Sequence, residues 1–309
     1  MDIVPYRDLK IKENVFILWL KSFGWPGSAG WLANFKKYET RIGNGPVGMC
    51  GLIDGKIVGF VGIMVIPTRT RHGEIENVGG IYAVAVRPSY MRQGIGRKLL
   101  DASENYMRQQ GMKLSFLTTS RSIVAFQWYC DVGYEVVETV DNYPYMYKVF
   151  DPPRSVSRKK SADKKNKLNM KEVQKLFDWY SDKHCGFVIR NLRELKSREM
   201  TDVFSKKLSI MVDGGYALLK GDCDSVQYKE ILARNQKTYR ELIKLAEAKA
   251  KYAAVAICPF DSKAQKAFQK ARYQTDYGNY GVLMHKQLTG VTFSDFYDDS
   301  FMFSELDSF

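Results

Sequence analysis

The residues best suited to bind an anion are the two glycines and two arginines of RQGIGR, residues 92–97. An apolar, β-branched run at residues 81–86 precedes them, and a helical pattern of apolar residues begins at Ile95. A strand, a glycine turn and a helix in this order point free backbone N–H groups and the positive end of a helix dipole at one place. That arrangement favours a phosphate group.

Two familiar phosphate-binding motifs do not fit this spacing. A P-loop has Lys and then Ser or Thr after its last glycine, whereas Arg97 and Lys98 follow Gly96. A Rossmann fingerprint needs a third glycine at position 99, which is Leu99. An ordinary strand-to-helix turn without a ligand is therefore the alternative at this point.

Two motifs, the turn itself and a segment about thirty residues further along the chain, together support a ligand-binding turn. Residues 86–100, VRPSYMRQGIGRKLL, resemble the acetyl-CoA pyrophosphate loop of the GCN5-related N-acetyltransferase (GNAT) superfamily, with Met91 where the family has Arg or Gln. Residues 125–134, AFQWYCDVGY, resemble the family pattern A-x-x-F-Y-x-x-x-G-F. Ser122 stands where the family usually has Asn. The resemblance covers residues 40–150.

Local patterns in this region make further predictions. Asp54-Gly55 between two strand-like runs predicts a tight hairpin. The pair Gly79-Gly80 predicts a bulge or a close backbone approach, and residues 135–150 predict a closing strand pair. We expect Trp128 to have a structural role.

The resemblance implies a mixed α/β fold and acetyl-CoA as the co-substrate. It also implies that Tyr129 is the general acid that protonates the departing thiolate. A phenol with an ordinary pKa of about 10 is protonated at neutral pH. The alternative is that Tyr129 is a core aromatic of an amphipathic helix. The residues expected to bind the cofactor are Val84, Ala85, Val86, Met91, Arg92, Gln93, Gly94, Ile95, Gly96, Arg97 and Ser122.

Length and composition set the broad class. A chain of 309 residues predicts two globular domains, at roughly 150 residues for each. The net charge of +13 allows nucleic acid, an anionic membrane surface or a polyphosphate cofactor as a partner. Five dispersed Cys and three His predict no metal site and a reducing cytoplasm. The absence of a signal peptide and of a long apolar run predicts no membrane association.

The second half of the sequence reads as a degenerate copy of the first. A shift of 139 residues places Ala125 on Ala264, but it places Gly94 and Gly96 on Ala233 and Asn235. A pyrophosphate needs the close backbone approach that glycine allows, so we expect no cofactor there. The predicted organisation is a catalytic GNAT domain at 1–150, a basic linker at 151–169, a degenerate GNAT-like domain at 170–289 and an acidic, aromatic tail at 290–309.

The tail is too apolar to be solvated and is expected to dock on the body. It carries six aromatic residues and five acids, with no Lys or Arg, and ends on Phe309. The tandem pattern is similar to the enhanced intracellular survival (Eis) type of acetyltransferase, in which a terminal Phe carboxylate lies near the acetyl group. The resemblance implies a catalytic role for the Phe309 carboxylate. The alternative is a tail that only packs.

These observations predict an N-acetyltransferase that transfers acetyl from acetyl-CoA to a primary amine by direct attack in a ternary complex. The acceptor is expected to be a small molecule or peptide, and cationic, because the tail and residues 74–76 are acidic. Nucleic acid is not the expected partner, and the sequence leaves the oligomeric state open. The alternative is a non-catalytic protein that senses CoA or binds nucleic acid through the basic linker.

Overall fold

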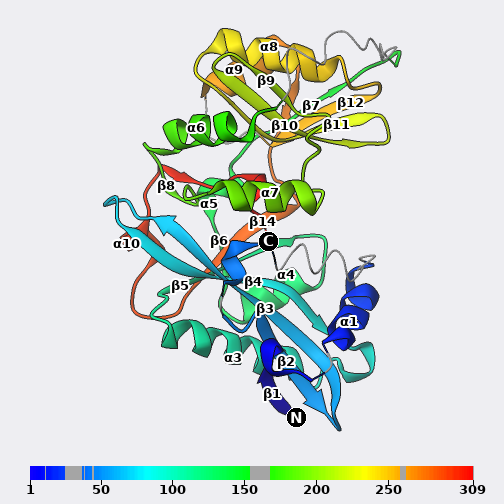
Figure 1. Cartoon of the computed structure of the whole chain (residues 1–309), viewed down its shortest axis with the longest axis vertical. Helices are drawn as coiled ribbons and strands as arrows, with labels where there is room; N and C mark the ends of the chain where they lie inside the picture. Colours follow the sequence, from blue (N-terminus) through cyan, green and yellow to red (C-terminus); the bar gives the residue numbers. More distant parts are fainter. Residues whose placement is uncertain are drawn as a thin grey trace. The chain divides into compact units, whose positions relative to one another are not determined.

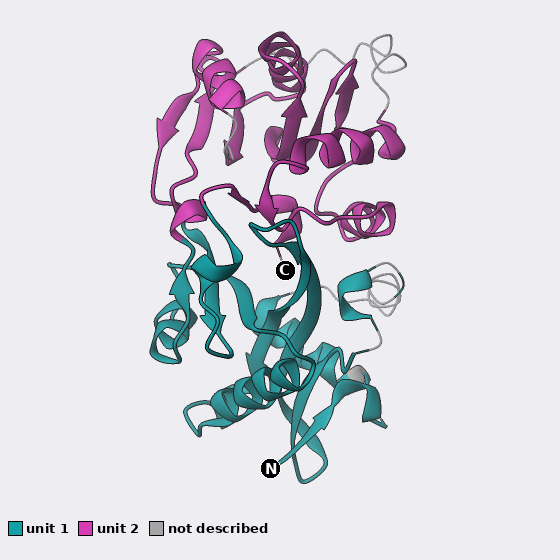
Figure 2. Cartoon of the chain, turned by 90° about the vertical axis from the view of Figure 1, so that its left-hand side faces the viewer, with its two compact units in different colours: residues 1–137, 280–298, 309 teal, residues 138–279, 299–308 magenta. Residues whose placement is uncertain are grey.

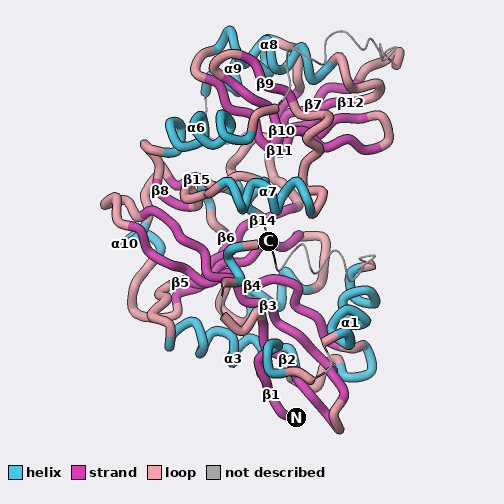
Figure 3. Tube along the Cα trace, in the orientation of Figure 1, coloured by secondary structure: helices cyan, strands magenta, loops and turns pink. Residues whose placement is uncertain are grey.

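The computed structural model describes residues 1–10, 12–24, 37, 39–43, 45–153, 168–257 and 262–308. The chain forms two compact units (Figure 2), the first from residues 1–137 and 280–298 and the second from 138–279 and 299–308. Each unit has a mixed sheet with helices, which confirms the predicted α/β class (Figure 3). Within these ranges no helix is long and apolar enough to cross a membrane.

Figure 1 labels the elements of both units except β13 and β15. The first unit contains β1 (Asp2–Pro5), α1 (Glu13–Phe23), β2 (Gly48–Ile53), β3 (Lys56–Arg69), β4 (Ile75–Val86), α3 (Ile95–Gln109), β5 (Leu114–Ser120), α4 (Ala125–Asp131), β6 (Glu135–Val136), β14 (Gly281–Gln287) and α10 (Phe293–Phe296). The second contains α5 (Glu138–Asp141), β7 (Tyr145–Val149), α6 (Met170–Ser181), β8 (Cys185–Gly186), α7 (Leu192–Met200), β9 (Ile210–Val212), β10 (Gly215–Asp222), β11 (Ser225–Ala233), α8 (Gln236–Glu247), β12 (Ala253–Ile257), α9 (Ser262–Lys270), β13 (Gln274–Asp276) and β15 (Phe301–Met302).

The sheet of the first unit runs β1-β2-β3-β4-β5-β14-β6. Along this order the β4–β5 pair is parallel and the other pairs are antiparallel. Asp54 and Gly55, which predicted a tight hairpin, connect β2 to β3 with φ values of 50° and 72°. Two positive φ values are what a type I′ turn requires, so that prediction is confirmed.

Helices cover both faces of this sheet. On one face, α3 buries Leu99, Leu100 and Met107 in a cluster with strand residues such as Ile81. Tyr82, the next residue of β4, points to the opposite face and packs on Phe60. On that face Trp19 of α1 also packs on Phe60, with ring centroids 5.1 Å apart. Trp19 of α1 therefore belongs to the core, whereas Phe23 at the end of the helix is exposed.

The sheet of the second unit repeats the same pattern. Its order is β13-β7-β12-β11-β10-β9, and β11–β12 is again the parallel pair beside antiparallel neighbours. The helix after the longer parallel strand, α8, buries Tyr239, Leu242 and Ile243 against the sheet, as α3 does in the first unit. The two units thus share one topology.

The two sheets exchange a strand. The sequence predicted that residues 135–150 form one closing strand pair, and this prediction is wrong. β6 pairs with β14 in the first sheet, whereas β7 pairs with β12 and β13 in the second. β14, which comes late in the chain, pairs with β5. The compact units therefore differ from the contiguous segments 1–150 and 170–289.

The same interaction fixes each exchanged strand. Lys286 of β14 donates to both carboxylate oxygens of Glu104 on α3 at 2.8 Å, and Lys148 of β7 donates to Glu247 on α8 at 2.8 Å. Both glutamates are buried, so each needs the lysine as a partner. The repeated pair favours these strands over other strands of similar pattern.

A buried histidine on β14 predicts acid sensitivity. His285 is 7% exposed, and its Nδ1 has no hydrogen-bond partner among the described residues. Burial lowers the pKa of His285 below its ordinary 6.5, with Glu135 acting in the opposite direction. The unfolded chain therefore binds the proton more readily, and folding stability is lost as the pH falls below about 6.5.

We expect His285→Phe to flatten that loss, because a phenyl ring fits beside Phe116 and Phe293 and does not titrate. Urea unfolding between about pH 7 and 5 measures it. His72→Phe is the matched control, since His72 is exposed. An unchanged pH dependence in His285→Phe would assign the acid sensitivity to other groups.

Candidate active site

The parallel strands of the first unit separate where the predicted site begins. β4 and β5 pair over three residues each, Gly79 to Ile81 against Ser115 to Leu117. β4 continues to Val86 with β3 alone, and the residues of β5 change from buried at Leu117 to half-buried at 118–120. The edge of β4 beyond Ile81 can therefore bond an extended ligand through its main chain.

A β-bulge diverts β4 at this point. The register with β3 shifts so that β4 has one extra residue between Tyr82 and Ala85, and Ala83 has a φ of +49°. Bulges re-aim a strand, often beside a functional site. Tyr82 anchors this one, because its hydroxyl donates to the Val47 carbonyl at 2.9 Å.

The bulge is not at Gly79-Gly80, where the sequence suggested a bulge or a close backbone approach. A β-carbon at Gly79 would lie 2.2 Å from the Met107 sulfur of α3. This glycine therefore lets α3 approach the sheet. A β-carbon at Gly62 would lie 2.4 Å from the Tyr82 ring, so Gly62 makes the space for the anchor of the bulge.

The predicted glycine turn leads directly into α3. Gly94 is the N-cap of α3 with φ +76°, a conformation that L side chains rarely adopt, and Arg92 has φ +59°. No side chain caps this helix end. The N–H groups of residues 95–97 lie in the first turn, where an α-helix leaves amides without intrahelical partners. They are therefore available to an anion.

Gly96 brings the parts of the site together. A β-carbon at this position would lie 3.7 Å from side-chain atoms of Trp128 on α4 and of Val86 on β4. The end of β4, the start of α3 and one side of α4 thus meet at the turn. The sequence predicted a structural role for Trp128. Its place in the motif, directly before Tyr129, is the signal that could have indicated this contact.

The remaining predicted cofactor residues divide by burial. Ala85 and Ile95 are 4% and 5% exposed, so they can offer only main-chain groups to a ligand. Val84 and Val86 are half-buried on the free edge of β4. Met91 is exposed in the turn.

The polar side chains near the turn already have local partners. Gln93 Nε2 donates to the Ser89 carbonyl at 3.2 Å, and Arg97 pairs with Asp101 at 3.0 Å on the helix surface. Ser122 Oγ lies 2.8 Å from Ser120 Oγ after the end of β5. Because all these contacts are exposed, an anion can replace them at little cost.

Tyr129 lies on α4 beside Trp128, with ring centroids 5.0 Å apart, and is 7% exposed. Its main-chain carbonyl accepts from Tyr134 N at 2.9 Å, which fixes the end of the helix. Burial raises the pKa of Tyr129, so its phenol stays protonated at neutral pH. Within the described part of the chain no hydrogen bond occupies its hydroxyl.

The other predicted catalytic residue, Phe309, lies outside the described residues. The segment before it is held within the second unit. Asp307 accepts from Arg190 Nη2 at 2.7 Å, and the Leu306 carbonyl accepts from Arg198 Nε at 2.8 Å.

The corresponding turn of the second unit is shorter than the sequence comparison suggested. Ala233 is the last residue of β11, so its equivalence with Gly94 is wrong. Residues 234–235 connect β11 to α8, whereas residues 87–94 connect β4 to α3. Asn235 caps α8 by accepting from Thr238 N at 3.0 Å. The loop that could surround a pyrophosphate is missing.

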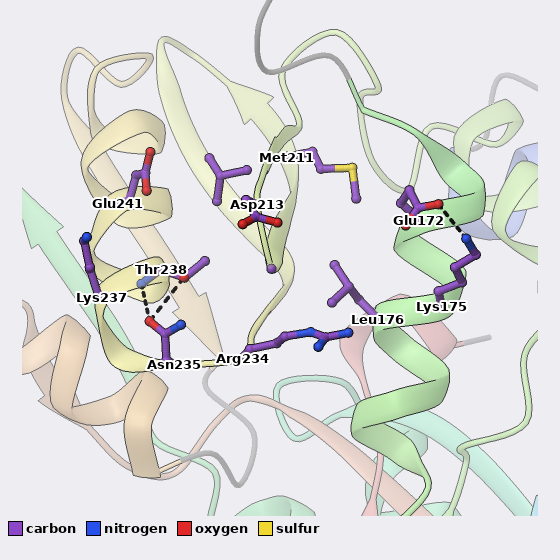
Figure 4. A pocket seen from close by; sticks show the side chains of 12 residues that line it. Glu172, Lys175, Leu176, Met211, Asp213, Arg234, Asn235, Lys237, Thr238 and Glu241 are labelled. Atoms are coloured by element: carbon purple, nitrogen blue, oxygen red, sulfur yellow. Dashed lines mark hydrogen bonds and ion pairs between the residues drawn. The ribbon is translucent and has the colours of Figure 1, made fainter.

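A cavity of about 760 Å³ lies beside this short turn, between α6 and α8 (Figure 4). Its charged lining includes Arg234, Lys237 and Lys175, and equally Asp213, Glu241 and Glu172. Glu172 and Lys175 pair at 2.8 Å. A lining of balanced charge does not favour a polyphosphate, in contrast to the turn of the first unit.

Comparisons with known proteins agree with this geometry. Residues 13–131 match the model of the acetyltransferase (GNAT) family. No curated protein sequence shows significant similarity to the chain. Among solved structures, a GCN5-related N-acetyltransferase from Kribbella flavida superposes with a TM-score of 0.64 at 16% identity, covering 93% of this chain and 72% of that one.

Two further structures share the fold over 93% of this chain. A probable N-acyltransferase of unknown function from Enterococcus faecalis has a TM-score of 0.65 at 15% identity, over 72% of its length. Eis1 from Mycobacterium abscessus has a TM-score of 0.62 at 12% identity, over 74% of its length. At identities this low, the superpositions show a common fold and nothing finer.

Proposed function

Because the chain belongs to the GNAT superfamily through residues 13–131, a family of N-acyltransferases, we propose that it is an acetyl-CoA-dependent N-acetyltransferase acting on a primary amine. Acetyl-CoA supplies an activated acyl group as a thioester. The residues of the first unit fit such a ligand, since an uncapped helix start follows a strand edge that is free for main-chain bonding.

The binding groups act through charge and main-chain geometry. The amides of residues 95–97 and the charges of Arg92 and Arg97 bind the pyrophosphate. The main chain from Val84 to Val86 bonds the pantetheine arm as an added strand. Both interactions orient the donor.

Two proton movements accompany direct transfer. The amine attacks as its neutral form, so its ammonium must first lose a proton to a base. The thiolate that leaves must gain one, and the phenol of Tyr129 donates it. We propose the Phe309 carboxylate for the amine side, where it orients the ammonium or accepts the proton through water; an α-carboxyl with a pKa of about 3.7 is a weak base unless desolvated. A cationic amine suits this role.

The observation that carries the proposal is the meeting of β4, α3 and α4 at Gly96. The test is a panel of small amines, polyamines, aminoglycosides and Lys-containing peptides with acetyl-CoA, followed by thiol release. We expect turnover with at least one cationic amine. Tight CoA binding without turnover on any amine would instead favour a CoA-sensing protein.

Tyr129→Phe should lower kcat about 10- to 1000-fold with little change in KM for acetyl-CoA, because acid–base assistance is worth roughly 10²–10⁴. The substitution keeps the ring that packs on Trp128 and Tyr134. Steady-state kinetics at saturating amine measure it. Tyr106→Phe on α3 is the control for loss of a hydroxyl. An unaltered kcat in Tyr129→Phe would assign the proton to water or another group.

A further inference from the structure

The two helices α8 and α9 form one layer on the sheet of the second unit. Both bury small and apolar residues in the same cluster, including Tyr239 and Leu242 from α8 and Ala267 and Phe268 from α9. The two helices also contact each other, and Figure 1 shows them together at one end of the second unit. Their remaining faces therefore share one outer surface.

That outer surface is almost uniformly basic. α8 exposes Lys237, Arg240 and Lys244, and α9 exposes residues 263, 266 and 270, which are all Lys. Both sets have the spacing i, i+3, i+7, which places each set in one row along its helix. We call the two rows the basic face. Arg272 is also exposed just after α9.

Exposed cations outnumber exposed acids six to one on these two helices, and the one acid, Glu241, lines the cavity beside Lys237. α9 carries no acid, and the two acids of α8 are Glu241, which is exposed, and Glu247, which is buried and bonded to Lys148. Among the described residues, Lys237, Arg240, Lys244, Lys266 and Lys270 make no ion pair. Elsewhere in the unit, Lys229 and Lys148 have carboxylate partners. The like charges of the two rows repel each other. A bound polyanion would neutralise them, so its binding would be favourable.

We propose that the basic face binds the phosphate backbone of a nucleic acid duplex, without reading its sequence. Each row spans about 10 Å at 1.5 Å per residue. A duplex carries one phosphate charge per about 1.7 Å of axis, so this length presents about six charges, equal to the six cations of the face.

The composition of the face separates this partner from two others. No large apolar residue is exposed on α8 or on the described residues of α9, so the face has nothing to insert into a bilayer. A protein partner would use exposed aromatic anchors, and neither helix offers one.

The test uses the full chain and a fluorescein-labelled 30-base-pair DNA duplex, with anisotropy measured at several KCl concentrations. If all six cations engage, log K should fall against log[salt] with a slope of about −5. Lys263→Gln/Lys266→Gln/Lys270→Gln should reduce the magnitude of the slope by about 2.7, since each phosphate contact contributes about 0.9.

A matched triple variant, Lys183→Gln/Lys206→Gln/Lys207→Gln, removes the same charge from exposed positions of the same unit outside the face. It should keep the original slope. Equal losses in both variants would show that net charge alone attracts DNA and would overturn the proposal. So would binding to vesicles of phosphatidylserine but not to duplex. Retained acetyl-CoA binding in both variants shows that they fold, and it separates this test from that of the proposed function.

Discussion

Gly96→Leu will weaken acetyl-CoA binding at least about a hundredfold, because it covers amides that donate to a charged group, each worth roughly 1.5–3 kcal/mol. The protein itself tolerates a β-carbon there, since its nearest contacts are 3.7 Å away at Trp128 and Val86. The longer side chain extends over the start of α3, where we propose that the pyrophosphate binds. Isothermal titration calorimetry measures the affinity.

Two variants separate this effect from damage to the fold. Gly96→Ala should bind more tightly than Gly96→Leu, because the extra carbon makes only ordinary contacts. Asn235→Leu changes the corresponding helix start of the second unit, and it should leave affinity intact while costing about 0.5–2 kcal/mol of stability through loss of a cap. The proposal fails if Gly96→Leu binds normally or if calorimetry finds two CoA sites in each chain.

Arg190→Met will destabilise the protein by about 3–5 kcal/mol, the cost of leaving buried charge without its partner. Arg190 donates two hydrogen bonds to Glu230 at 2.9 Å and two to Asp307 at 2.7 and 3.2 Å. Tyr216 adds a bond to Glu230 at 2.7 Å. Burial alone would raise the pKa of Glu230, but the charge and hydrogen bonds of Arg190 bring it below 4.5.

Denaturant unfolding of the second unit at neutral pH measures this loss. The lowered pKa of Glu230 means that its contribution is present above pH 4.5 and is lost as the pH falls through the folded value. Lys175→Met, which breaks the exposed pair with Glu172, is the control and should cost no more than about 1 kcal/mol. A similar cost for both substitutions would show that the Arg190 network is not a stabilising centre.

Local features of the first unit were predictable because neighbouring residues determine them. Asp54 and Gly55 readily adopt the positive φ values of a tight hairpin, and the glycines at 94 and 96 allow the uncapped helix start. The motif spacing placed Tyr129 on a helix. The bulge at Ala83 could not be predicted, since it depends on Tyr82 reaching Val47, which is distant in sequence.

Strand partners and loop lengths in the second half were beyond the sequence pattern. β7 and β14 are both short, half-apolar strands, and alternation alone does not say which sheet each joins. The ion pairs of their lysines with Glu247 and Glu104 stabilise the observed pairing, but they join residues that are distant in sequence. A constant shift of 139 residues also assumed equal turns, and so it placed Gly94 on a strand residue.

The strand exchange has a consequence for biosynthesis. β5 has its antiparallel neighbour only when β14 is available, so the first sheet stays open until residue 287 has left the ribosome. At a synthesis rate of about 5–20 residues per second, the edge of β5 stays unpaired for roughly 10–30 s. Such an edge can pair with another nascent chain. A truncation before β14 should therefore leave the first unit unfolded, although every residue of its glycine turn is present.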